Sequence, residues 1–303
     1  MASHTQPRPI GSGDLSSTEW LYPPEELFYG PLRRLGEGVG KVVYASPHWV
    51  VKRDRSPSEV VAIIVLWNVF RKLKRVLPRG WVDALLRGPS KQIRLLRVLV
   101  QGAMIVVPKS VWFTRRIRKA WTVYISRDRR GRRLAEQHLK GTSLIPETVT
   151  FPPSSVKVAG WPGWLTVTEA TERVECTLNN RLDALAAAGE FEKLEEWLVR
   201  FLELRQSGWS HGLFSMDAHL KNFGVCGDRV VLLDTGGLTN RWAEIMDTLA
   251  YEEGVTEPHV RLGLGDLLKD RPDIASRFNE RWKATVNSAA VRDLWPTSPD
   301  RSR

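Results

Sequence analysis

Two β-rich runs joined by a Gly-Asp turn occupy residues 222–234, and this pattern limits the fold of the chain more than any other stretch. It predicts a β-hairpin, because short apolar runs on either side of such a turn pair with each other. The first and last residues of an antiparallel hairpin meet at its open end, so Asn222 and Asp234 should lie side by side. Asp217 lies five residues before Asn222 in an expected loop and can reach the same place.

These three side chains would bring two carboxylates and one amide oxygen together. Oxygen ligands of this kind suit Mg²⁺, which usually takes one or two carboxylates from a protein and completes its shell with substrate phosphates and water. The sequence therefore predicts a magnesium site at the open end of the hairpin.

The remaining patterns indicate an α+β fold. Residues 32–52 have the composition of a small antiparallel sheet with a glycine-rich turn inside it, and a second strand pair is expected at 156–158 and 164–167. Ser56 is a typical N-cap for a helix that would run to about residue 76.

A further helix is expected from about Glu190 to Gln206. Its apolar residues fall at helical spacing and would form one buried face: Leu194, Trp197, Leu198, Phe201 and Leu202. We expect this helix to end at Ser207-Gly208, because glycine often follows the last helical turn.

Positive charge is concentrated in one segment. The chain has a formal net charge of +11, but residues 67–133 alone contain 19 Lys or Arg against two acidic residues, Asp83 and Asp128. We call residues 67–133 the basic segment. A segment of this kind attracts an anionic membrane surface, an acidic partner or nucleic acid, of which nucleic acid is the least favoured here, and a solvated charged surface is the alternative.

The sequence also argues against export and membrane insertion. The first 20 residues lack the apolar stretch behind a basic head that a secretory signal needs. The longest apolar run, at 98–107, contains Gln101 and spans about half of the ~20 residues that a membrane helix needs. With only two cysteines, we expect a cytoplasmic protein that could attach to the inner face of a membrane through its basic segment.

The combined motifs resemble the protein kinase-like superfamily. Asp217-x-x-x-x-Asn222, followed twelve residues later by Asp234-x-Gly, is similar to the catalytic loop and metal-binding loop of those proteins. Upstream, LGEGVGKVVY at 35–44 resembles a glycine-rich nucleotide loop, and VVK resembles the strand that ends in an ATP-binding lysine, here Lys52. The short C-terminal half, without an Ala-Pro-Glu motif, looks more like aminoglycoside phosphotransferases and lipopolysaccharide core kinases than regulated protein kinases.

This resemblance implies a two-lobed fold, with a small antiparallel sheet lobe and a helical lobe, and it implies ATP and Mg²⁺ as cofactors. Asn222 and Asp234 would hold Mg²⁺, Asp217 would accept the proton of an attacking hydroxyl or orient it, and Lys221 would offset charge on the transferred phosphoryl group. The resemblance assigns ATP binding to Gly36, Gly38, Gly40, Lys52 and Glu59.

The implied activity is phosphoryl transfer to a hydroxyl of a small molecule, a sugar or a lipid-linked acceptor, and adenylyl transfer stays open as an alternative. The same resemblance divides the chain into four parts. Residues 1–29 would be a flexible tail and 30–175 a nucleotide-binding lobe in which the basic segment is an insertion. Residues 176–295 would be a helical lobe with both loops, and 296–303 a C-terminal tail.

Two departures from the family pattern keep other functions open. Ser215 stands two residues before Asp217, where the family usually has His, and the glutamate that pairs with Lys52 could be Glu59 or Glu136. Both departures favour a pseudokinase, which would use the fold as a binding module with the basic segment as contact surface. A nucleic-acid-binding protein is a third hypothesis, and its affinity would fall steeply with salt.

Overall fold

The computed structural model describes residues 21–37, 40–56, 59–60, 126–159 and 164–296. Within these ranges the chain combines a five-stranded antiparallel sheet with a set of helices, which confirms the α+β class. The same ranges contain no helix that is both long enough and apolar enough to cross a membrane.

The sheet has the strand order β1-β2-β3-β5-β4. Its strands are β1 (Arg33–Glu37), β2 (Lys41–Ala45), β3 (Trp49–Asp54), β4 (Thr148–Lys157) and β5 (Trp164–Glu172). The strands expected within 32–52 and the pair expected around 156–167 are therefore present, although β4 and β5 are longer than predicted.

The two faces of the β2–β3 hairpin differ, because successive side chains of a strand point to opposite faces. Val42, Tyr44 and Val51 are buried in an apolar cluster on one face. Lys52 is paired with Val43, and Lys41 lies two residues from Val43 along β2, so both lysines project from the other face. We call this second face the charged face of the sheet.

The apolar face also buries part of the N-terminal region. Leu27, in the short 3₁₀ helix η1 (Glu25–Leu27), is fully buried in the same cluster, although it falls in the stretch predicted to be a flexible tail. Glu26 next to it accepts hydrogen bonds from Ser46 at 2.7 Å and from the His48 backbone nitrogen at 3.0 Å. These contacts attach residues 26 and 27 to the sheet.

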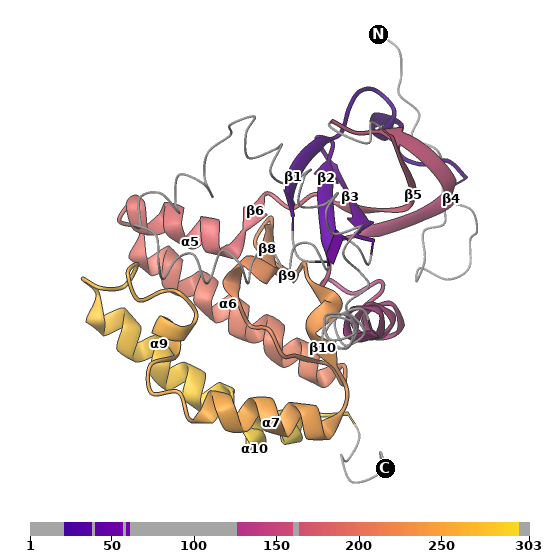
Figure 1. Cartoon of the computed structure of the whole chain (residues 1–303). Coiled ribbons are helices and arrows are strands. Elements are labelled where there is room, and N and C mark those ends of the chain that lie inside the picture. Colours follow the sequence, from indigo (N-terminus) through magenta and orange to yellow (C-terminus); the bar gives the residue numbers. More distant parts are fainter. Residues whose placement is uncertain (1–20, 38–39, 57–58, 61–125, 160–163, 297–303) are drawn as a thin grey trace, which may run out of the picture.

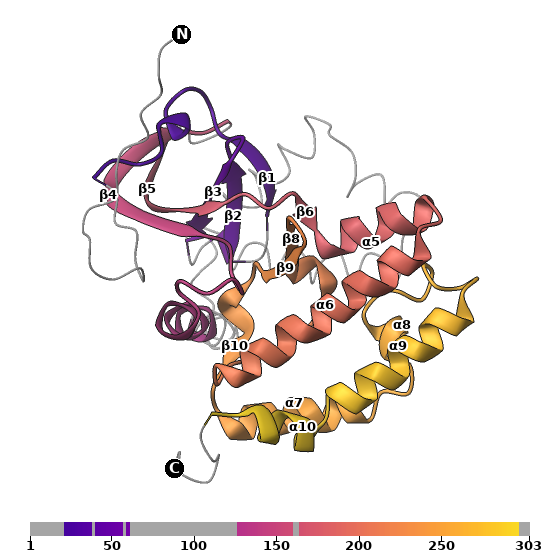
Figure 2. The ribbon, with the colours of Figure 1, turned by 180° about the vertical axis from the view of Figure 1, so that it is seen from behind.

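The second half of the chain is mainly helical. Its helices are α5 (Leu178–Ala187), α6 (Phe191–Ser210), α7 (Trp242–Glu253), α8 (Pro258–Arg261), α9 (Pro272–Thr285) and α10 (Ser288–Leu294). In Figures 1 and 2, α7, α9 and α10 lie on the side of α6 that faces away from the five-stranded sheet. A separate helix at 126–138 lies beside β10 (Leu238–Thr239) in both views.

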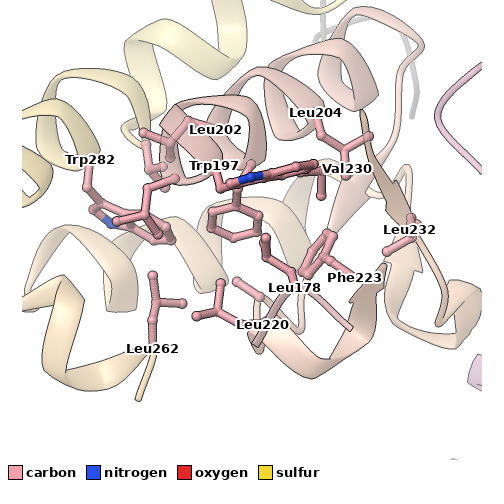
Figure 3. Packing of buried hydrophobic residues seen from close by; sticks show 14 of the residues in the cluster. Leu178, Trp197, Leu202, Leu204, Leu220, Phe223, Val230, Leu232, Leu262 and Trp282 are labelled. Carbon is pink, nitrogen blue, oxygen red and sulfur yellow. The ribbon is translucent and has the colours of Figure 1, made fainter. Parts of the chain in front are cut away.

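The predicted apolar face of α6 is confirmed, since all five of its predicted residues are buried. Figure 3 shows part of the cluster, where side chains of α5, α6, β8 (Phe223–Cys226), β9 (Arg229–Leu232) and α9 meet. The predicted end of the helix was wrong. Gly208 lies inside α6, and the glycine that follows its end is Gly212, whose φ of 70° and hydrogen bond to the Trp209 oxygen are typical of a helix C-terminus.

Most of the basic segment, at 67–125, lies outside the described residues. The same holds for most of the helix expected between 56 and 76, but its N-terminus is visible and begins as predicted. The Ser56 hydroxyl accepts from the Glu59 backbone nitrogen at 3.3 Å, and the Glu59 carboxylate accepts from the Ser56 backbone nitrogen at 2.8 Å. This reciprocal pair is a capping box.

Candidate active site

The predicted hairpin is formed by β8 and β9, and it brings Asn222 and Asp234 together. Its turn residue Gly227 has a φ of 61°, a left-handed conformation that glycine adopts without strain. At the open end, the Asn222 carbonyl oxygen accepts hydrogen bonds from the backbone nitrogens of Leu233 at 2.9 Å and Asp234 at 3.4 Å. The prediction that these two residues lie side by side is confirmed.

Asp217 lies next to this pair, in the loop between β7 (Phe214–Ser215) and the 3₁₀ helix η2 (Leu220–Asn222). Because β7 pairs with β10 and the Met216 nitrogen donates to the Gly237 oxygen at 3.0 Å, this loop is joined to the turn after Asp234. The Asp217 backbone oxygen accepts from the Asn222 side chain at 3.5 Å. Asp217 and Asp234 are both exposed, so both are accessible to a ligand.

Lys52 reaches the same place from the charged face of the sheet. Its Nζ donates to the backbone oxygen of Leu233 at 3.1 Å, across 181 residues of sequence. Leu233 directly precedes Asp234, so this contact holds the ammonium beside the predicted metal-binding turn. Desolvation by the surrounding protein atoms, and then the like charge of Lys41, lower the pKa of Lys52 from its usual value, although the residue remains accessible to solvent.

The glycine-rich turn connects the end of β1 to the start of β2. Gly36 follows an irregularity in the β1–β2 register, and Gly40 directly precedes β2. A Cβ atom at either position would meet no atom within 4 Å, so a bound molecule has room to approach the backbone there. Gly38, the third predicted glycine, lies outside the described residues.

Glu59 does not pair with Lys52, which corrects its predicted role. Its two carboxylate oxygens accept from the Arg53 guanidinium at 2.7 and 3.0 Å. Arg53 and Lys52 are successive residues of β3 and therefore point to opposite faces of the sheet. The hydrogen bond from Arg53 outweighs burial and lowers the pKa of Glu59 to about 2.

The other two predicted residues are exposed. Lys221 lies in η2, directly before Asn222. Glu136, the alternative partner for Lys52, lies on the helix at 126–138. The hydrogen bond of Lys52 goes to the Leu233 carbonyl oxygen and not to Glu136.

The structure adds a cluster of four charged residues that sequence reasoning missed. Lys41 and Asp128 form an ion pair at 2.8 Å between Nζ and Oδ1, and the other Asp128 oxygen accepts from Arg132 at 2.8 Å. Arg132 also contacts Asp54 of β3 at 3.0 Å. Two signals pointed to this cluster: Lys41 directly follows the glycine-rich turn, and Asp128 is one of two acids in the basic segment.

The helix at 126–138 is seated directly against the turn that follows Asp234. A Cβ atom on Gly131 would lie 2.1 Å from the Thr235 carbonyl oxygen, and one on Gly236 would lie 2.6 Å from Oδ1 of Asp128. Real side chains do not tolerate such distances, so both glycines permit the close approach. The end of the basic segment is therefore part of the site.

Few side chains at the candidate site are suited to bind a metal ion. The described part of the chain contains no group of three or more His, Cys, Asp or Glu side chains that could hold a metal. Asn222 and Asp234 offer one amide and one carboxylate, which fits a magnesium ion that shares its shell with substrate phosphates better than an ion held by protein alone.

Comparison with known proteins supplies no identity. No protein-family model matches this chain, and no curated protein matches it either. The function therefore has to follow from the residues that the fold brings together.

Proposed function

We propose that the protein is an ATP- and Mg²⁺-dependent phosphotransferase with a two-lobed, protein kinase-like fold. The observation that carries this proposal is the hydrogen bond from Lys52 Nζ to the Leu233 oxygen at 3.1 Å. It joins the strand after the glycine-rich turn to the hairpin end where Asn222 and Asp234 meet. The residues proposed for phosphate and for metal binding, far apart in sequence, thus lie in one site.

The arrangement of the core supports the two-lobed description. Buried apolar residues form one cluster at the sheet and a separate, larger cluster among the helices. The Lys52–Leu233 contact joins the sheet to the hairpin that packs into the helical cluster. A nucleotide site between a sheet lobe and a helical lobe is the arrangement that the family resemblance implies.

Each residue then has a defined task. The backbone at Gly36 and Gly40 and the ammonium of Lys52 would bind the phosphates, while Asn222 and Asp234 would hold Mg²⁺. The bound ion would neutralise charge that develops on the transferred phosphoryl group. Positioning and electrostatic stabilisation of this kind supply most of the rate in phosphoryl transfer.

Asp217 would orient the acceptor hydroxyl and take its proton. Asp217 is exposed and lies beside Asn222. The His219 backbone nitrogen donates to Oδ1 of Asp217 at 3.3 Å, which fixes the carboxylate and leaves its second oxygen for a substrate. The acceptor would be a hydroxyl of a small molecule, a sugar or a lipid-linked compound.

Turnover tests this assignment. ATP hydrolysis or phosphoryl transfer by Asp217→Asn should fall by roughly 10² or more, because a general base typically contributes that factor, while ATP affinity should change little. Asp228→Asn, the same change at the exposed turn of the hairpin, is the matched control and should keep the parent's activity.

A pseudokinase is the second candidate, and one observation favours it. Within the part of the chain that the structure covers, the Lys52 ammonium donates a hydrogen bond to a backbone carbonyl oxygen and forms no ion pair with a carboxylate. Equal turnover by the parent and Asp217→Asn, together with retained ATP binding, would support this binding role over catalysis.

A further inference from the structure

The charged face of the sheet carries a second lysine to which the proposed function gives no role. In the antiparallel register of β2 and β3, Lys41 lies opposite Asp54 and Lys52 lies opposite Val43. The two lysines are therefore diagonal neighbours on one face of these strands. Their charges interact, since Lys41 contributes to the lowered pKa of Lys52. Two cations so close together favour binding of an anion between or beside them.

The partner of Lys41 is an ionised carboxylate. The side chains of Lys41 and Asp128 are only 19% and 25% exposed, and their charged atoms are 2.8 Å apart. Burial raises the pKa of Asp128, but Lys41 and Arg132 lower it more, so its pKa lies below the usual value and the carboxylate is ionised at neutral pH. Asp128 therefore neutralises much of the charge of Lys41.

The position of this ion pair relates it to both halves of the site. Lys41 directly follows Gly40, where the backbone is open to a ligand. Asp128 lies against Gly236, two residues after Asp234. The pair thus joins the backbone proposed to bind phosphates to the turn proposed to bind metal.

We propose that Lys41 is a second phosphate-binding residue of this site, and that Asp128 competes with the phosphates for its ammonium. This inference rests on the proposed ATP-binding function. Phosphate oxygens and the Asp128 carboxylate are alternative partners for the same ammonium, so strengthening one contact weakens the other.

Competition gives the two residues opposite effects on ATP affinity. Loss of Lys41 removes a cation that contacts the phosphates, so ATP should bind more weakly. Loss of the Asp128 charge frees Lys41 and also removes a negative charge near the phosphates, so ATP should bind more tightly. A merely structural Asp128 would give the reverse sign, because its loss would loosen the helix at 126–138 from the site.

The experiment compares binding of MgATP and of adenosine to the full chain by isothermal titration calorimetry. Lys41→Met should raise the ATP dissociation constant by about tenfold or more, the usual size for a lost charge-assisted hydrogen bond, without changing adenosine affinity. Asp128→Asn should lower the ATP dissociation constant several-fold. Lys157→Met is the matched control. It makes the same change at the end of β4, next to the residue before β1, and this variant should bind ATP like the parent.

The double variant tests the competition itself. Most of the gain from Asp128→Asn should disappear in the Lys41→Met background, because coupled residues are not additive. Thermal unfolding without ligand checks that each variant is folded, and Lys41→Gln replaces Lys41→Met if the methionine variant does not fold.

Three results would overturn the inference: Lys41→Met binding ATP like Lys157→Met, Asp128→Asn weakening ATP binding, or an equal effect of Asp128→Asn in both backgrounds. Failure of the proposed function looks different, since the parent itself would then bind no MgATP. If the parent binds MgATP and Lys52→Met does not, while Lys41→Met is unaffected, only the role of Lys41 is wrong.

Discussion

Alternation along β3 separates two charged residues that are adjacent in sequence. Lys52 points toward the candidate site, whereas Arg53 points away and forms a bidentate ion pair with Glu59. The seven-residue spacing between Lys52 and Glu59 left their pairing open, because spacing alone does not show on which face of a strand a helix begins.

The Arg53–Glu59 pair should give part of the stability a pH dependence. The pKa of Glu59 falls from 4.5 to about 2 through the Arg53 hydrogen bond. A pKa that is depressed on folding stabilises the protein above the unfolded-state value, so the free energy of unfolding should decline as the pH falls from 4.5 to about 2. Urea unfolding across this range measures it. Glu59→Gln should remove part of the decline, and equal slopes for parent and variant would show that the pair contributes nothing.

Arg205 and Glu252 form a buried ion pair at 3.1 Å, and their side chains are 2% and 0% exposed. Removing one partner of such a pair leaves an uncompensated charge and typically costs about 3–5 kcal/mol. Glu252→Gln should therefore lower the free energy of unfolding strongly.

The exposed Arg277–Glu195 pair is the matched control for this substitution. Glu195→Gln should cost about 1 kcal/mol or less, as is usual for a surface pair. Chemical denaturation of both variants gives the comparison, and losses of equal size would mean that burial does not control the strength of these two ion pairs.

At the scale of elements, the helix at 126–138 contacts both the five-stranded sheet and the helical part of the chain. Asp128 pairs with Lys41 of the sheet, and Arg130 forms a bidentate ion pair with Glu244 of α7. Leu134 packs in the helical cluster. Residues 126–138 fall within 30–175, the range predicted for the sheet lobe, whereas Leu134 and Ala135 are buried in the helical cluster.

Gly131 should be essential for the seating of this helix. Alanine is favoured over glycine inside helices by up to ~1 kcal/mol, so propensity alone predicts that Gly131→Ala stabilises the protein. Its Cβ atom would lie 2.1 Å from the Thr235 backbone oxygen, so the helix or the turn must move. We expect a lower melting temperature and weaker MgATP binding.

Gly208→Ala is the control for this prediction. Gly208 also lies inside a helix, and its Cβ atom would have its nearest neighbour at 3.5 Å, an ordinary contact. It should keep or raise the melting temperature. A Gly131→Ala variant that behaves like Gly208→Ala would show that the helix does not need its close contact with the turn.

At the scale of the whole molecule, local patterns predicted individual elements well, whereas the ion pairs around the candidate site were missed. The hairpin that joins Asn222 to Asp234 follows from the turn between two β-rich runs, and the apolar face of α6 follows from its spacing. The ion pair between Lys41 and Asp128 joins residues 87 positions apart in sequence, and no periodicity marks it. The end of α6 was misplaced because burial of Trp209 in the helical cluster outweighs the low helix propensity of Gly208.

The last residues of the basic segment contribute to the fold around the candidate site. Arg130 and Arg132 at its end are held in ion pairs with Glu244, Asp54 and Asp128, so these two charges stabilise the fold near the site. An anionic membrane surface or acidic partner for residues 67–125 stays a prediction, since these residues lie outside the described ranges.

Thermal unfolding of the full chain with ATP, in the presence and absence of Mg²⁺, is the most direct test of the proposed site. A ligand that binds only the folded state raises its stability by about 2.7 kcal/mol at a hundredfold excess over its dissociation constant, so MgATP should raise the melting temperature of the parent. Lys52→Met and Asp234→Asn should abolish this rise, while the control variants Lys157→Met and Asp228→Asn should retain it. A parent unaffected by MgATP, or a rise that persists in both Lys52→Met and Asp234→Asn, would contradict a nucleotide site between the sheet and the hairpin.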